Sequence, residues 1–145
     1  MAGEKSTTYG GQLLALLFNA TAIPNIAINA TSSPLTNLYV SLHTADPGAS
    51  GNQTTNELSY TGYARVAVAR TTAGWVVTGA SASPAANVIF PSPTGTPTQI
   101  ATFLGVGSAS SGAGTLFYAG PVSPTITITA GLPPTLTTAT TVGEG

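Results

Sequence analysis

The sequence has almost no charge and no cysteine. Only 5% of its residues are charged, three basic and four acidic, where an ordinary soluble domain has roughly 25%. Three basic residues are too few to neutralise a phosphate backbone, which excludes nucleic acid as a partner. Without cysteine, disulfides and thiolate metal sites are excluded. No apolar run approaches the roughly 20 residues that span a bilayer, and no basic amphipathic helix offers membrane binding.

The scarcity of charge also predicts which residues form the surface. A soluble monomer normally carries a mixed charged surface and a net charge away from zero, whereas this chain has a net charge of -1. We therefore expect a surface of small and hydroxyl-bearing residues that is largely covered by partners. The expected partners are copies of the chain itself, with a trimer as one possible form, and a neighbouring structural protein.

The hydrophobic pattern indicates the fold class. The chain has 145 residues, of which 42% are hydrophobic, enough for one domain with its own core. Leu38, Val40 and Leu42 alternate with Tyr39, Ser41 and His43, the period of a strand. Further short strands are predicted at residues 63–71, 74–78, 87–90, 100–106, 115–119 and 125–129, separated by Gly, Pro and Ser clusters. This spacing predicts an antiparallel β-sandwich, jelly-roll-like or Ig-like.

The two ends differ from this pattern. Residues 12–20 are strong helix formers, preceded by the candidate N-caps Ser6, Thr7 and Thr8 and followed by Pro24, which is predicted to end the helix. The predicted division is therefore an N-terminal helix and connector (1–37), a β-sandwich (38–131) and a C-terminal arm (132–145). Both ends supply predicted assembly contacts, which are Leu13, Leu14, Leu17, Phe18, Pro133 and Pro134.

Few side chains could carry out chemistry. His43 is the single histidine, and Asp46 lies in the turn directly after it, without a GxSxG nucleophile motif anywhere. Asp46 and Glu57 are the only acids available for paired-carboxylate hydrolysis or for calcium, and no DxDxDG-type loop holds them. We therefore predict no catalytic residue, no cofactor and no metal site. His43 is instead predicted to end a strand and to hydrogen-bond the turn that follows.

Two further positions are predicted to be structural. Asp46, Pro47 and Gly48 form a turn in which Gly48 takes a positive φ. Arg65 lies in a predicted strand on the face opposite Val66 and points either to a partner or to one of the loop acids. Arg65 is therefore added to the predicted assembly contacts.

One stretch carries a family resemblance. LYVSLHTADPGASG, followed by ELSYTGYARVAV, resembles a small family of phage virion proteins. The later segments NVIFP, IATFLGV, LFYAGPVS and TITAG fit the same layout, so the resemblance spans about residues 38–131. It implies a virion building block and brings no active-site residues with it.

Composition and resemblance together predict a function in the virion. The main hypothesis is a capsid cement (decoration) protein that stabilises the head by packing on the major capsid protein at the capsid surface. The first alternative is a tail or fibre component. A second is a carbohydrate-binding receptor module, which requires an exposed aromatic patch around Tyr60, Tyr63 or Trp75.

Overall fold

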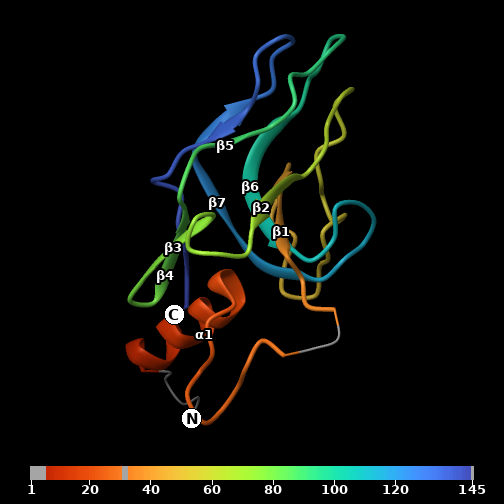
Figure 1. Cartoon of the computed structure of the whole chain (residues 1–145). Helices are drawn as coiled ribbons and strands as arrows, with labels where there is room; N and C mark the ends of the chain where they lie inside the picture. Colours follow the sequence, from red (N-terminus) through yellow and green to blue (C-terminus); the bar gives the residue numbers. More distant parts are fainter. Residues whose placement is uncertain (1–5, 31–32, 145) are drawn as a thin grey trace.

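A computed structural model describes residues 6–30 and 33–144, and it is mainly β with one helix (Figure 1). A four-stranded antiparallel sheet has the order β2-β1-β6-β7, formed by Val66–Ala69, Asn37–His43, Ile100–Gly107 and Leu116–Thr127. A second sheet has the order β3-β4-β9, formed by Trp75–Thr78, Ser81–Pro84 and Val142–Gly143. The third sheet pairs β5 (Val88–Ile89) with β8 (Thr135–Leu136). The predicted fold class, mainly β and antiparallel, is confirmed.

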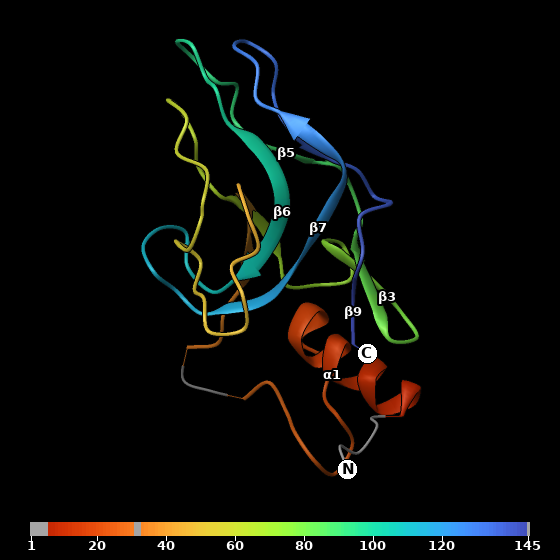
Figure 2. The ribbon, with the colours of Figure 1, turned by 180° about the vertical axis from the view of Figure 1, so that it is seen from behind.

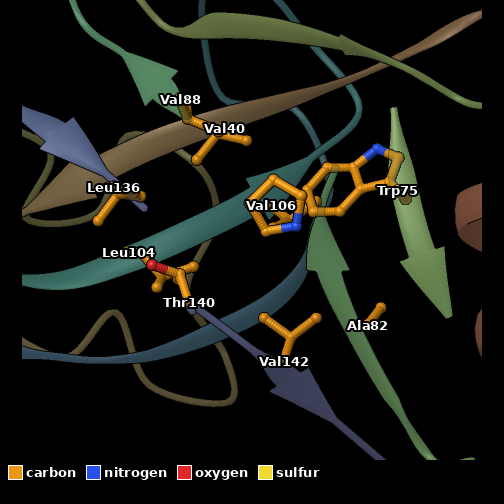
Figure 3. Close-up of a pocket in the computed structure, with 10 residues that line it drawn as sticks. Val40, Trp75, Ala82, Val88, Leu104, Val106, Leu136, Thr140 and Val142 are labelled. Atoms are coloured by element: carbon orange, nitrogen blue, oxygen red, sulfur yellow. The ribbon is translucent and has the colours of Figure 1, made fainter. Parts of the chain in front are cut away.

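The core lies where the three sheets meet, which gives the fold its sandwich-like character. Val40 and Val106 from the large sheet face Trp75 from β3, Val88 from β5 and Leu136 from β8 (Figure 3). The cavity left between them has a volume of about 10 Å³, at the lower limit for a single water molecule. Val40, on the apolar face predicted for the first strand, therefore packs against both smaller sheets.

Helix α1 (Thr7–Asn19) begins where the capping residues predicted it, because the Ser6 hydroxyl accepts a hydrogen bond from the Tyr9 backbone N–H at 3.2 Å. It does not extend to Pro24: the helix ends at Asn19, and Ala20 adopts a left-handed conformation with φ 54°. The prediction that Pro24 ends the helix was wrong. The left-handed conformation of Ala20 ends it earlier and lets Thr21 N donate to Ala15 O, a carbonyl of the last helical turn.

The helix belongs to the core of the chain. Leu14 and Phe18 are fully buried, and the Phe18 ring meets Trp75 of β3 edge-on with ring centroids 4.6 Å apart. Leu13 and Leu17 are partly buried. In this conformation Leu14 and Phe18, predicted as assembly contacts, stabilise their own chain and do not reach its surface. No helix in residues 6–30 and 33–144 is long and apolar enough to cross a membrane.

Arg70, directly after β2, fixes the helix to the large sheet. Its guanidinium donates to the carbonyl oxygens of Leu16 (2.7 Å) and Leu17 at the C-terminal end of α1, and to Leu35 O at 2.9 Å. Carbonyls at a helix C-terminus lack partners within the helix and carry partial negative charge, so a cation stabilises them. Burial lowers the pKa of Arg70. Arg70 thus joins the helix, the connector and β2.

The C-terminal arm also packs on the chain itself. Pro134 is buried and its carbonyl accepts a hydrogen bond from Phe90 N at 2.8 Å, while Pro133 is exposed. Beyond it, β8 and β9 place Leu136 and Val142 in the core. The chain therefore returns to end beside α1, and the loops that follow β5 and β7 lie at the opposite end of the molecule (Figure 2).

Candidate functional site: a buried polar cluster

The strongest concentration of polar contacts surrounds an internal ion pair between Glu57 and Arg65. Arg65 Nε and Nη2 donate to the two carboxylate oxygens of Glu57, both at 2.7 Å. The Arg65 side chain is 2% exposed and the Glu57 side chain is 13% exposed. This two-bond geometry is the strong form of an arginine–carboxylate contact. Of the two alternatives predicted for Arg65, the structure shows contact with a loop acid.

The same arginine holds a distant loop. Arg65 Nη1 and Nη2 donate to the carbonyls of Ala109 and Gly112, at 2.9 and 2.8 Å. Gln53, fully buried, accepts from Ala109 N through Oε1 at 2.9 Å. The glycine- and serine-rich loop between β6 and β7 is therefore held by two hydrogen bonds from Arg65 of the ion pair and by one to Gln53.

Glycine is required where this loop meets Gln53. A Cβ on Gly107 would lie 2.2 Å from the Gln53 side chain, and a Cβ on Gly114, which has φ 43°, would lie 2.1 Å from Gln53 Oε1. Real Cβ contacts are never this short. The two glycines thus make room for the glutamine that anchors the loop.

His43 and Ser41 lie beside the ion pair on β1 and are fully buried. His43 Nδ1 lies 2.8 Å from the carbonyl oxygen of Thr55, and Nε2 lies 2.8 Å from Ser41 Oγ. Because a carbonyl only accepts, Nδ1 carries the proton and Nε2 accepts from the serine hydroxyl. The histidine therefore bonds the far end of the loop that follows β1.

The serine–histidine contact looks like a nucleophile and its base, yet its surroundings differ from a catalytic arrangement. In a triad a carboxylate orients the histidine, whereas here the partner of Nδ1 is a backbone carbonyl. Gly105 of β6 lies so close that an added Cβ would be 2.6 Å from both Ser41 Oγ and His43 Nε2. A buried hydroxyl packed under a backbone strand offers no space for a substrate.

This environment makes folding stability depend on pH. Burial, the largest influence, lowers the pKa of His43 below its ordinary value of 6.5, against the Thr55 hydrogen bond and the Glu57 charge, which raise it. In the window between the lowered folded value and 6.5, the unfolded chain binds more protons, so the free energy of unfolding falls as pH falls. Well above pH 6.5 His43 is neutral in both the folded and the unfolded chain, so the free energy of unfolding no longer depends on its protonation.

Urea unfolding between pH 7.5 and 5.5 measures this effect, since His43 is the single histidine. We expect wild-type stability to decline with a slope of at most about 1.4 kcal/mol per pH unit. The variant His43→Gln should show a flatter profile over the same range. Identical slopes in both proteins would contradict the assignment of a neutral, buried imidazole.

The three aromatic residues considered for a glycan-binding surface are largely packed inside. Tyr60 and Trp75 are 6% and 3% exposed. Tyr63 stands edge-on to Tyr60, with ring centroids 5.3 Å apart, and stacks on Phe90 at 6.2 Å. The Tyr63 hydroxyl donates to Glu57 Oε1 at 3.0 Å and accepts from Leu42 N at 3.0 Å. The exposed aromatic patch required by the receptor-module alternative is therefore not formed by these three residues.

The predicted turn after β1 has the expected geometry. Gly48 adopts φ 73°, and its N–H donates to Asp46 Oδ1 at 2.8 Å. Glu57, the other acid considered for calcium, accepts hydrogen bonds from Arg65 and Tyr63. Within residues 6–30 and 33–144, no group of three or more metal-ligating side chains comes together. Neither acid is thus part of a ligand cluster there.

Four of the five charged residues that the structure describes are at least partly buried and make contacts within the chain. Arg65 pairs with Glu57, Arg70 caps α1, and Glu144 contacts the Tyr118 hydroxyl. Asp46 is the only exposed charged residue in the part of the chain that the structure describes. The surface formed by residues 6–30 and 33–144 is therefore nearly uncharged, which is rare in a free monomer.

The described chain is mainly β, and the groups of its largely buried polar cluster bond to one another and to its own loops. The family model described as "Podophage GP4 fiber I protein gp80" matches residues 6–143, and the chain belongs to this family. No curated protein matches the chain. The family makes the chain a structural component of a phage virion and favours the fibre alternative over the capsid cement hypothesis.

Proposed function

We propose that this protein is a non-enzymatic building block of a phage tail fibre, present in several copies that contact one another and a neighbouring tail protein. The observation that carries the proposal is the fibre family match, which covers α1, all three sheets and the C-terminal arm. A nearly uncharged surface supports multi-copy packing, because uncharged surfaces can be buried without stranding unpaired charges.

The proposal of a structural role also follows from where the polar groups lie. Ser41 bonds His43 and Glu57 bonds Arg65, and the two pairs also reach three loop carbonyls, those of Thr55, Ala109 and Gly112. Their hydrogen-bonding capacity is therefore used to hold loops in place. A rigid, loop-stabilised sandwich suits a component that transmits load and keeps its shape. On this account substitution of His43 changes stability and removes no activity.

The copy number in purified particles tests the proposal. Mass spectrometry with isotope-labelled peptides would measure this chain relative to the major capsid protein. A fibre component should be present at a small fraction of the major capsid protein. A ratio approaching that of the capsid protein, meaning hundreds of copies, would favour the cement hypothesis instead.

A further inference from the structure

The two edges of the large sheet differ in chemistry. β7, one edge, contains Pro121 and Pro124, and proline on an edge strand blocks pairing with another chain. β2, the other edge, has the sequence VAVA, without proline or charge. Natural sheets usually protect an edge by charge, proline or a covering segment. β2 carries neither charge nor proline, and the turn that follows it packs only against its Ala69 end, where Gly74 lies close to the Ala69 carbonyl.

The backbone of β2 has unused hydrogen-bonding groups. Arg70 N donates to Thr36 O, and the register pairs Leu38 with Val68 and Val40 with Val66. Because bonding alternates along an antiparallel pair, Val66 and Val68 bond to β1, while the N–H groups of Ala67 and Ala69 point away from it. Neither N–H has a hydrogen-bond partner among residues 6–30 and 33–144, whereas the outward carbonyl of Ala69 already accepts from Thr71 N at 2.9 Å. The groups left unused are therefore the N–H and carbonyl of Ala67 and the N–H of Ala69.

Space and polarity beside β2 suit an added strand. A groove of about 280 Å³ runs along the strand and is bordered by Ala73, Gly74 and Val88. Ala67 and Ala69 are exposed and have small side chains, which allow close approach of another backbone. Ile89, next to Val88 on β5, is 57% exposed.

We propose that β2 is the docking edge for a second copy of this chain, whose own β2 pairs with it antiparallel across a two-fold axis. A two-fold interface requires a self-complementary surface. An uncharged edge meets this requirement because it does not repel its copy. With Ala67 opposite Ala67 of the copy, each donates its N–H to the carbonyl of the other, and Val66 of each lies opposite Val68 of the other.

The inference rests on the proposed multi-copy role and adds the surface through which two copies meet. The pairing would join the two four-stranded sheets into one continuous sheet. Main-chain bonds give such an edge its affinity, and the side chains that flank it give its specificity.

Sedimentation of the full chain over a range of concentrations, combined with amide hydrogen exchange, tests this pairing. The amides of Ala67 and Ala69 should become protected as concentration rises and the dimer forms. Ala67→Pro removes the outward N–H without removing a bond to β1. We expect it to weaken dimerisation at least tenfold, which corresponds to about 1.4 kcal/mol, and to abolish the protection at Ala69.

Ala67→Lys and Ala119→Lys form a matched pair, because Ala119 is an exposed alanine on the opposite edge strand of the same sheet. The first should weaken dimerisation and the second should not, with both variants folded as judged by melting. A monomer at all concentrations, or a dimer in which these amides exchange freely, would overturn the inference. Dimerisation through another surface would leave the proposed fibre role standing, since that role is tested separately in the particle.

Discussion

Replacing Arg65 by alanine is expected to lower the free energy of unfolding of the isolated chain by about 3–5 kcal/mol, because it leaves the buried Glu57 carboxylate without its cation. The loop carbonyls of Ala109 and Gly112 lose their donors at the same time. From the sequence, Arg65 was expected to affect assembly more than folding. The side chain is internal, so the loss should appear first in folding. Urea unfolding of the purified chain measures it.

A double replacement separates the ion pair from the shape of the site. Arg65→Met combined with Glu57→Leu removes both charges while keeping apolar volume, and such pairs are often close to neutral. The double variant should therefore be more stable than Arg65→Ala alone. If Arg65→Ala cost less than about 1 kcal/mol, within the range of exposed ion pairs, the cluster would not be a principal support of the fold.

Replacing Phe18 by alanine should cost about 3–5 kcal/mol, as expected for an aromatic side chain removed from a packed core. Phe18 is fully buried, contacts Trp75, and has its ring centroid 5.9 Å from that of Tyr118. The consequence for the N-terminal segment is large. Removal of residues 1–20 should prevent stable folding, although the sequence placed this helix outside the predicted β-sandwich.

Tyr9→Ala provides the control on the same helix. Tyr9 is 40% exposed, and its replacement should change stability by no more than about 0.5 kcal/mol. Thermal melting and urea unfolding of both variants make the comparison. Equal stability of Phe18→Ala and Tyr9→Ala would contradict the placement of α1 in the core.

The strands that could be predicted are those whose own residues show a strand-forming pattern, without reference to the strands that pair with them. β1 and β6 lie within one residue of the predicted bounds, because branched and aromatic residues alternate along them. β4 (Ser81–Pro84) was missed, since Ser, Ala and Pro favour a turn and only pairing with β3 and β9 makes this segment a strand. The predicted strands 115–119 and 125–129 are parts of one edge strand, β7, where Gly120 and Pro121 are tolerated.

Of the polar cluster, only the features that depend on residues close together in the sequence, or on the small number of acids, could be predicted. The turn at Gly48 follows from neighbouring residues, and the candidate partners of Arg65 follow from the scarcity of acids. The contact of Arg65 with Ala109 and Gly112 joins segments more than 40 residues apart, and no local pattern encodes it. The close approach of Gly107 to Gln53 is likewise a product of tertiary packing, because glycine in a loop sequence suggests only freedom of the backbone.

Electron microscopy of purified particles labelled with gold-conjugated antibodies against this chain tests the central claim, that it is a component of the tail fibre. The account predicts gold at the fibres of the tail, with the capsid surface unlabelled. Label distributed over the capsid, with the tail bare, would contradict it.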